Sequence, residues 1–307
     1  MRTASTVAMD TIITIAVDSS PDSAEAVGRA LGWFVELERV CSRFDPASEL
    51  FRLSQRCGAP IPVSRLLFEV VGFALKVTEA TDGLFDPTLG ADLARRGFDR
   101  NYRTGQRLKP SGASAGNRRD VVLDPARQTI TLRRPLLLDL GAVVKGLAID
   151  LAARELSACS ALAIDAGGDV LVKGQNGRGE PWLVGIAHPR RPGALIASLR
   201  LTAGAVCTSG DYERRATDPG RHHLLDPRTR TSANAAISCT VVAASAAVAD
   251  ALSTAAFVAG PKAGVRLLEA QEVDGMLVGP DLRMESTRGF DRWLAAPLPS
   301  PGNSGLA

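Results

Sequence analysis

Apolar and polar positions follow two different periods along the chain. Residues 9–17 (MDTIITIAV) alternate and are rich in β-branched side chains, which is the pattern of a half-buried strand. Residues 23–40 and 66–81 place apolar side chains at helical spacing, the first after the start signal SSPDS and the second before an Asp82-Gly83 turn. These patterns predict one strand and two helices in this part of the chain.

The same criteria predict further elements downstream. Strands are predicted at residues 121–123, 129–132, 136–140, 161–165, 169–173, 182–187, 194–201 and 237–243, and helices at residues 141–157, 245–258 and 261–271. Because strands and helices are mixed without a regular βαβα alternation, the pattern favours an α+β fold. The polar, glycine-rich residues 104–120 are predicted to form a surface loop, and residues 297–307 a disordered tail.

Composition and charge narrow the class of protein. The chain has 307 residues, 45% of them apolar and 22% charged, which excludes a mainly disordered chain and fits one large domain or two closely packed ones. With 36 basic and 33 acidic residues, the net charge of +3 gives no argument for a nucleic-acid or membrane surface. Five widely spaced cysteines without a CxxC pair fit a reducing compartment better than a disulfide framework or a cysteine-rich metal site.

Signals for export or membrane insertion are also missing from the sequence. The N-terminal residues carry one arginine and no long apolar run before Asp10, so no secretory signal is apparent. The most apolar later stretch, residues 237–260, is interrupted by Asp250 and is rich in alanine and serine. It falls short of the roughly 20 strongly apolar residues of a spanning helix. We therefore expect a cytoplasmic protein without a membrane span.

Two segments place anion- or metal-binding groups at the start or on one face of a predicted helix. In residues 136–150 (LLLDLGAVVKGLAID), Asp139 ends an apolar run, and Lys145 lies about one turn into the helix that follows. The free N–H groups at that helix start favour binding of a phosphate. The alternative is purely structural: Asp139 caps the helix, and the Lys145 side chain extends to solvent. Further on, Asp250 and Thr254 are four residues apart, so one helix face carries a carboxylate and a hydroxyl that suit Mg²⁺. The alternative to a metal site is that Asp250 faces solvent and the Thr254 hydroxyl bonds to the backbone of its own helix.

Two loops carry further candidate chemistry. In residues 205–227, the run Thr208-Ser209-Gly210 could form a phosphate loop, and His222-His223 could accept a proton near neutral pH, or this could be a hairpin with surface histidines. Residues 81–90 (TDGLFDPTLG) are either a structural loop or a backbone edge for a planar ligand. No GxGxxG, GxxxxGK[ST] or GxSxG motif occurs in a suitable context, which argues against Rossmann, Walker and α/β-hydrolase sites.

Taken together, these segments resemble the ApbE-type flavin transferases (FAD:protein FMN transferases). The resemblance rests on Met9-Asp10-Thr11 and on residues 42–54 (SRFDPASELFRLS), 81–90, 138–150 (LDLGAVVKGLAID), 163–174 (AIDAGGDVLVKG), 208–215 (TSGDYERR), 223–229 (HLLDPRT) and 248–260 (VADALSTAAFVAG). It implies a single large α+β domain over residues 9–296, with mixed, mainly antiparallel sheets and packed helices, after a flexible N-terminus at residues 1–8. It also implies transfer of FMN from FAD, with Mg²⁺, to a threonine or serine hydroxyl of an acceptor protein that has an FMN-binding domain, with release of AMP.

Site residues follow from the resemblance, position by position. Asp250 and Thr254 match side-chain metal ligands, Ala142 matches a backbone-oxygen ligand, and Ser253 is a further candidate for the metal. Flavin-nucleotide contacts are matched by Met9, Phe44, Leu84, Phe85, Asp86, Asp139, Lys145 and Leu225. His223 matches the histidine before the final Asp-Pro and is our candidate for the catalytic base, with Asp226 as an orienting group; Asp250 is catalytic through the metal. An FAD-binding carrier without transfer activity, and a hydrolase that splits FAD into FMN and AMP, are the alternative functions.

The sequence departs from the family pattern at four positions. Asp10 puts a negative side chain where the family has glycine, Phe44 lacks the hydroxyl of the usual tyrosine, and Ser54 replaces a common asparagine. Arg230 stands where glycine is usual, and a turn with positive φ would be strained there. We expect these changes to affect flavin orientation more than metal binding.

Overall fold

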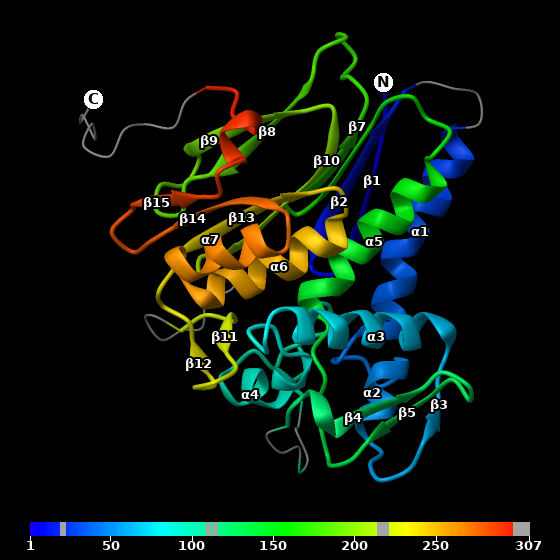
Figure 1. Ribbon diagram of the computed structural model, residues 1–307. Helices are drawn as coiled ribbons and strands as arrows, with labels where there is room; N and C mark the ends of the chain where they lie inside the picture. The colour runs from blue at the N-terminus through cyan, green and yellow to red at the C-terminus, as the bar shows by residue number, and fades with distance from the viewer. Residues whose placement is uncertain (19–22, 109–111, 113–115, 214–220, 297–307) are drawn as a thin grey trace.

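An antiparallel sheet of eight strands forms the centre of the computed structural model, which describes residues 1–18, 23–108, 112, 116–213 and 221–296. Its strands, in spatial order, are β1 (Arg2–Ala8), β2 (Thr11–Val17), β6 (Leu162–Ala166), β7 (Asp169–Lys173), β10 (Ala203–Gly210), β13 (Ser238–Ala243), β14 (Asp274–Val278) and β15 (Met284–Ser286) (Figure 1). Each neighbouring pair is antiparallel. Antiparallel neighbours need no helical crossover, which explains why the sequence lacks a regular strand–helix alternation.

Four helices cover one face of this sheet (Figure 1). They are α1 (Ser23–Cys41), α5 (Gly141–Glu155), α6 (Ala246–Ala259) and α7 (Pro261–Ala270). The small, apolar residues of α6 suit its central place, because β10 and β13 lie against it on one side and α5 and α7 flank it. A polar side chain on α6 is therefore removed from water, and Asp250 is only 6% exposed.

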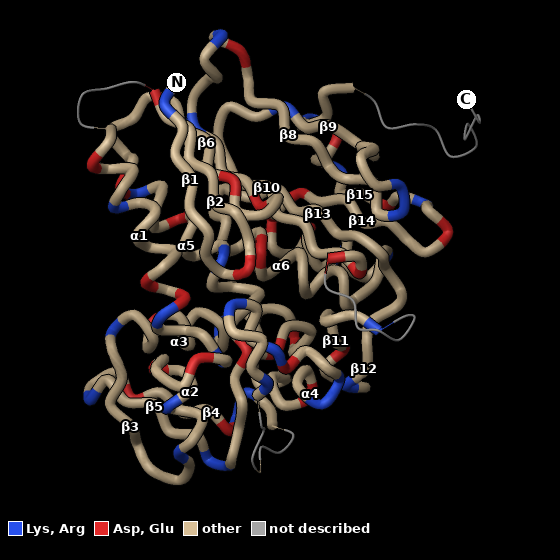
Figure 2. Tube along the Cα trace, turned by 180° about the vertical axis from the view of Figure 1, so that it is seen from behind, with Lys and Arg blue, Asp and Glu red and all other residues tan. Residues whose placement is uncertain are grey.

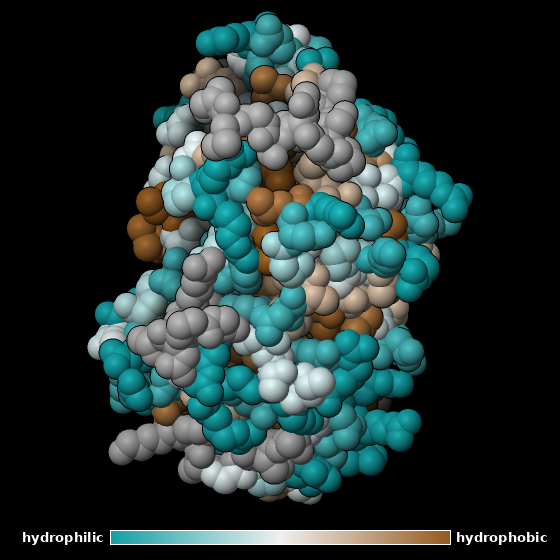
Figure 3. Space-filling view, turned by 90° about the vertical axis from the view of Figure 1, so that its left-hand side faces the viewer, coloured by the Kyte–Doolittle hydropathy of each residue, from teal (hydrophilic) through white to brown (hydrophobic). Residues whose placement is uncertain are grey.

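A hairpin of β8 (Trp182–Ala187) and β9 (Leu195–Leu201) covers the other face, together with the 3-10 helix η3 (Phe290–Trp293). Successive side chains of β10 point to opposite faces of the sheet. Val206 packs against the β8–β9 hairpin, and Cys207 packs against the helices. On the side of the molecule drawn in Figure 3, apolar residues form small separate patches in a mostly hydrophilic surface, as is usual for a folded domain.

Smaller elements form the lower part of the molecule in Figure 1. These are α2 (Glu49–Ser54), α3 (Arg65–Ala80), η1 (Pro87–Leu89), α4 (Gly90–Arg95), η2 (Arg118–Asp120), a sheet of β3 (Ile61–Pro62), β5 (Thr129–Leu132) and β4 (Val121–Asp124), and a hairpin of β11 (Leu225–Asp226) and β12 (Thr231–Ser232). Ile13 of the large sheet and Ile130 of the small sheet belong to one continuous buried cluster. The expected α+β fold with antiparallel sheets and packed helices is confirmed, and its largest buried cluster joins the two sheets.

Most elements predicted from periodicity are confirmed. The five predicted helices are α1, α3, α5, α6 and α7, and the predicted strands 161–165 and 169–173 are β6 and β7, joined through Gly167 and Gly168 at φ 65° and 93°. The elements α2, α4, β14 and β15 were not predicted; α2, α4 and β15 are too brief to show a clear period.

Three expectations about local structure were wrong. Residues 1–8, expected to be flexible, contain β1, which pairs with β2 along its whole length. The strand expected at residues 9–17 starts only at Thr11, because Met9 and Asp10 form the hairpin turn with φ 54° and 66°. Residues 136–140 form no strand, and instead run as a buried segment in which the Asp139 N–H donates to the Pro87 carbonyl at 2.8 Å.

Other expectations fall partly or wholly outside the described residues. Of the loop predicted at 104–120, residues 109–111 and 113–115 are not described, and its end forms η2 with a capping box at Asn117. The tail at residues 297–307 also lies outside the described residues. Within the described ranges, no helix combines the length and apolar character needed to cross a bilayer. The cytoplasmic location stays a prediction.

Candidate functional site

Helices α5 and α6 are held in one register by contacts between their backbones. A Cβ at Gly146 would clash with the Ala246 carbonyl oxygen and lie 2.7 Å from the Ala247 Cα, so the two helices approach as closely as glycine allows. Asp150 of α5 caps the start of α6, where its Oδ1 accepts from the Ala246 N–H at 2.8 Å and its Oδ2 from the Ser245 hydroxyl at 2.6 Å. Residues further along α6 are thereby fixed opposite the first turns of α5.

Asp250 lies at this contact between the two helices. Its Oδ2 accepts a hydrogen bond from the Gly146 N–H at 3.1 Å. In a regular α-helix that same N–H points towards the carbonyl oxygen of Ala142, four residues earlier. The Asp250 carboxylate therefore lies beside the first turns of α5, on the side where regular helix geometry places the Ala142 carbonyl. In Figure 2, acidic positions lie between the strands and α6, at the level where the upper and lower parts of the molecule meet.

Hydroxyl groups of α6 and β10 lie next to this carboxylate. Thr254 is one turn after Asp250 and is half-buried, and its Oγ1 is 3.1 Å from the Ser209 Oγ on β10. Ser253 is fully buried, and its hydroxyl donates to the Asp250 carbonyl at 2.8 Å. A carboxylate, a hydroxyl and a carbonyl oxygen are hard ligands that fit Mg²⁺. Among the described residues no cluster of three or more His, Cys, Asp or Glu could hold a metal, so such a site would rely on this mixed set of oxygens.

The half-buried Lys145 forms an ion pair with the buried Asp169 of β7, a partner that the sequence analysis did not find. Asp169 is itself held in place, because its Oδ1 accepts from the Thr208 N–H at 3.0 Å. Burial alone would lower the pKa of Lys145, but the negative charges of Asp169 and Asp250 outweigh it and raise the pKa above its ordinary value. Lys145 is therefore a fixed positive charge near Asp250 at neutral pH.

Arg43, two residues after the end of α1, contacts two of the expected flavin-binding residues. Its Nε lies 2.6 Å from the Asp139 Oδ2, and its guanidinium carbon lies 4.1 Å from the centre of the Phe44 ring. Asp139 uses its Oδ1 to accept from the Gly141 N–H at 2.8 Å, at the start of α5. The Arg43 Nη2 also donates to the Phe98 carbonyl at 2.7 Å. Sequence reasoning missed Arg43 because its acidic partner is distant along the chain.

The expected turn at Leu84-Phe85-Asp86 is packed against the core. Phe85 is 4% exposed, while Leu84 and Asp86 are half-buried. Asp86 caps η1 by accepting from the Thr88 N–H at 2.8 Å, and burial raises the pKa of its carboxyl group. Met9, also expected to contact flavin, is half-buried at the β1–β2 turn and packs against the same core.

The two adjacent histidines have different surroundings. His222 is 3% exposed, packs edge-on against Phe257 of α6, and accepts from the Leu224 N–H through Nδ1 at 3.3 Å. His223 is half-buried, and its ring centre lies 6.3 Å from that of Phe98. His222 is therefore packed in the interior, and the role of His223 as a catalytic base stays a prediction. The expected surface position of the pair is wrong for His222.

Three further expectations can be compared with this part of the structure. Leu225 is buried in β11 and packs with Leu89, Leu93 and Phe98. Both carboxylate oxygens of Asp226, the expected orienting group for His223, are bound by Arg228, whose hydrogen bond lowers the pKa of Asp226. The run Thr208-Ser209-Gly210 is no phosphate loop, because it forms the end of β10 and pairs with β13.

Arg230 adopts the positive φ that its position suggested, at 57°. Its side chain forms a 2.6 Å ion pair with Asp92 and donates to the Gly116 carbonyl at 2.9 Å. The Arg96 Nε donates to the Arg230 carbonyl at 2.9 Å. These contacts offset the strain of a side chain in the left-handed region.

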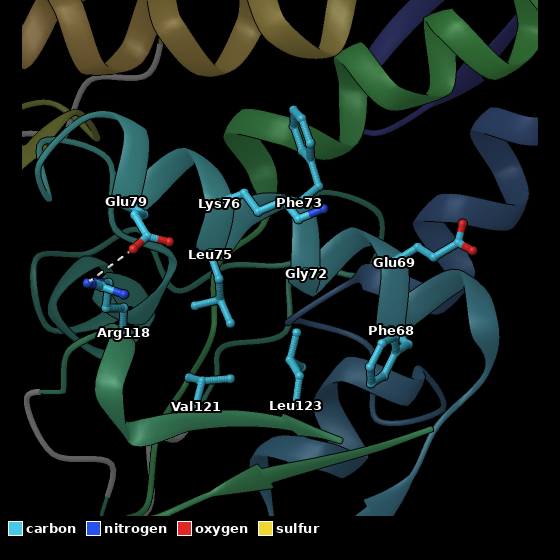
Figure 4. Close-up of a pocket in the computed structure, with 10 residues that line it drawn as sticks. All are labelled: Phe68, Glu69, Gly72, Phe73, Leu75, Lys76, Glu79, Arg118, Val121 and Leu123. Atoms are coloured by element: carbon cyan, nitrogen blue, oxygen red, sulfur yellow. Dashed lines mark ion pairs between the residues drawn. The ribbon is translucent and has the colours of Figure 1, made fainter. Parts of the chain in front are cut away.

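A separate hollow of about 480 Å³ lies between α3 and β4 (Figure 4). Phe68 and Leu75 of α3 line it opposite Val121 and Leu123 of β4, and Glu79 and Arg118 form a 3.8 Å ion pair at one end. None of the expected site residues lines this hollow. The candidate site is instead the region around the start of α5, where the Arg43–Asp139 pair and the Asp250 carboxylate approach the same helix turn.

Comparisons with known proteins identify the family of the chain. The ApbE family profile matches residues 9–277. A FAD:protein FMN transferase of Treponema pallidum is 32% identical over 279 residues, which cover 82% of this chain and 76% of that protein. The FAD:protein FMN transferase of Salmonella typhimurium is 31% identical over 273 residues, covering 83% and 76%.

Solved structures show the same fold. The ApbE protein of Thermotoga maritima superposes with a TM-score of 0.85 at 27% identity, covering 95% of this chain and 98% of that one. The flavin transferase ApbE of Vibrio cholerae gives a TM-score of 0.82 at 25% identity, covering 95% and 99%.

Proposed function

Since the chain belongs to the ApbE family, we propose that it is a FAD:protein FMN transferase, which moves FMN from FAD to a hydroxyl of an acceptor flavoprotein and releases AMP. The observation that carries this proposal is the hydrogen bond from the Gly146 N–H to the Asp250 carboxylate, which brings the carboxylate to the start of α5, with Thr254 one turn further along α6. This set of oxygens suits a cation that faces a diphosphate.

The cation that we propose is Mg²⁺, held by Asp250, Thr254 and the Ala142 carbonyl. When bound, it supplies positive charge that neutralises the diphosphate of FAD and aligns it for substitution. The hydroxyl of Ser253 is engaged with the Asp250 carbonyl and with Ser209, so we assign Ser253 a supporting role and not that of a direct ligand.

The reaction is a substitution at the phosphorus of the FMN half. The hydroxyl oxygen of the acceptor forms a bond to this phosphorus, the bond from phosphorus to the bridging oxygen breaks, and AMP leaves with that oxygen. Lys145 and the N–H groups at the start of α5 would stabilise the negative charge that develops on the leaving phosphate. The Asp169 carboxylate keeps the Lys145 ammonium in place and protonated.

Transfer also requires a proton acceptor and a support for the flavin. We propose that His223, which is half-buried beside Phe98, accepts the proton of the acceptor protein's hydroxyl group. Flavin contacts are assigned to Phe44, Asp139 and Leu225, which are linked through Arg43 and Phe98, and to Met9 and the Leu84-Phe85-Asp86 turn. Because Arg228 holds the Asp226 carboxylate, we assign no orienting role to Asp226.

One incubation separates the proposal from its two alternatives. The protein is mixed with FAD, Mg²⁺ and an acceptor that has an FMN-binding domain, and the products are resolved on a denaturing gel and by chromatography. A fluorescent acceptor band together with AMP supports transfer. Release of AMP with no labelled acceptor would make the protein an FAD hydrolase, and bound FAD with neither product would make it a carrier.

A further inference from the structure

Three hydroxyl groups from two elements form a continuous chain beside the proposed metal position. The Ser253 hydroxyl donates to the Asp250 carbonyl oxygen at 2.8 Å. The Ser209 Oγ on β10 lies 2.7 Å from the Ser253 Oγ and 3.1 Å from the Thr254 Oγ1. Three hydroxyl protons are thus available for three hydrogen bonds.

Counting those protons sets the direction of every bond in the chain. A carbonyl oxygen can only accept, so the single proton of Ser253 goes to Asp250. The Ser253 oxygen must then accept from Ser209, which uses the single proton of Ser209. The bond between Ser209 and Thr254 is left with one possible donor, and that donor is Thr254.

This direction leaves Thr254 prepared to bind a cation. Its proton points at Ser209, so its oxygen lone pairs point away from β10, and lone pairs are what a metal ion requires. We propose that Ser209 is a positioning residue that fixes the Thr254 hydroxyl in its metal-ligating orientation. This inference rests on the metal site of the proposed function and adds a residue from the sheet to it.

The register of β10 explains how Ser209 reaches α6. Ala205 and Cys207 pack in the cluster beneath the helices, and Ser209 continues the same alternation, so its side chain also faces α6. Thr208 faces the opposite way, and its Oγ1 lies 2.9 Å from the Thr240 Oγ1 on β13. The TSG segment therefore places two neighbouring hydroxyls on opposite faces, and only the Ser209 hydroxyl touches the proposed ligand.

The test measures cation binding directly, with Mn²⁺ as the probe for Mg²⁺. Free Mn²⁺ is titrated by its paramagnetic resonance signal in the presence of saturating FAD, for the wild-type protein, Ser209→Ala and the matched control Thr208→Val. Supporting residues behind a metal ligand usually contribute about 10- to 100-fold to metal affinity. We expect Ser209→Ala to weaken Mn²⁺ binding by about tenfold, Ser209→Thr to restore most of it, and Thr208→Val to leave it unchanged.

A second pair of variants separates positioning from a general loss of structure. In a Thr254→Ala background, Ser209→Ala should weaken Mn²⁺ binding no further, because the hydroxyl that it orients has gone. An equal loss with and without Thr254 would overturn the inference, as would wild-type Mn²⁺ affinity in Ser209→Ala. In both of those outcomes, FMN transfer by the wild-type protein would leave the proposed function standing. A wild-type protein that binds no Mn²⁺ with FAD would overturn the metal site and this inference together.

Discussion

The guanidinium of Arg43 and the carboxylate of Asp139 form a 2.6 Å ion pair that connects the end of α1 to the start of α5. The Arg43 side chain is only 8% exposed, so the pair is largely shielded from water. The second oxygen of Asp139 holds the Gly141 N–H, one residue before the carbonyl that we assign to the metal. The Asp139 side chain thereby connects the proposed flavin contacts to the proposed metal ligands.

Arg43→Ala should weaken FAD binding and destabilise the fold. It leaves the Asp139 charge without its partner, and breaking a buried pair in this way usually costs about 3 kcal/mol or more of unfolding free energy. We expect the KM for FAD to rise at least about tenfold, which corresponds to the loss of about 1.4 kcal/mol of binding. Urea unfolding and FAD-dependent kinetics measure the two effects.

The control for this change is Arg39→Ala, near the end of α1. Arg39 pairs with Glu36 at 2.6 Å but is 57% exposed, so its loss should change neither stability nor the KM appreciably. The double variant Arg43→Ala/Asp139→Asn should recover part of the stability, because the uncompensated charge is gone. If Arg43→Ala and Arg39→Ala behaved alike, the linking role of Arg43 would be refuted.

Asp250→Asn should reduce FMN transfer by orders of magnitude and keep the fold. It removes the only formal charge among the proposed metal ligands, while the amide oxygen can still accept from the Gly146 N–H. Labelling of an acceptor protein is followed by in-gel flavin fluorescence over a series of Mg²⁺ concentrations. Asp281→Asn, at a surface aspartate that is 57% exposed, is the control. Near-normal turnover of Asp250→Asn at limiting Mg²⁺ would rule out this site.

Gly146→Ala should separate α5 from α6. The added Cβ meets the backbone of Ala246 and Ala247, which cannot move aside as a flexible side chain would. We expect a loss of several kcal/mol, on the order of the larger overpacking effects, and weaker Mn²⁺ binding in any folded fraction. Gly28→Ala is the matched control, because its Cβ would meet nothing within 4 Å on the exposed face of α1. That change should stabilise the protein by up to about 1 kcal/mol, as thermal unfolding would show.

Asp86→Asn should raise stability at neutral pH and lower FAD affinity. Burial raises the pKa of Asp86 in the folded protein, so ionisation disfavours folding as the pH rises through that pKa. An asparagine carries no charge and can still cap η1. The difference in melting temperature between variant and wild type should therefore be largest above the raised pKa, and should shrink as the pH falls from that pKa towards the ordinary carboxyl pKa of about 4. A difference that is constant with pH would contradict this origin.

His223→Ala should slow transfer and flatten its dependence on pH. In our assignment His223 takes the acceptor's proton, so the wild-type rate should rise with pH as the imidazole loses its own proton. Rates of acceptor labelling between pH 5.5 and 8.5 give the profile, and FAD binding should stay near normal. An unchanged rate and profile would remove His223 from the mechanism.

The sequence by itself determined where the longer helices and strands lie and which kinds of side chain occur at the candidate site. The helical stripes of α1 and α3 and the spacing of Asp250 and Thr254 can be read locally, because a helix repeats every few residues whatever surrounds it. The segments shared with the ApbE family pointed to the same places. Short elements such as α2 and β15 escaped detection because a few residues carry no period.

Only the tertiary structure decided which partner each polar group receives. Arg43 meets Asp139, Lys145 meets Asp169, and Ser209 meets Thr254 across long stretches of chain. None of these pairs leaves a local pattern, since each depends on how strands and helices pack. The close approach of α5 and α6 at Gly146 has the same origin. From the sequence, a glycine inside a helix only lowers helix stability, and its packing role is visible only once the backbone of α6 is placed beside it.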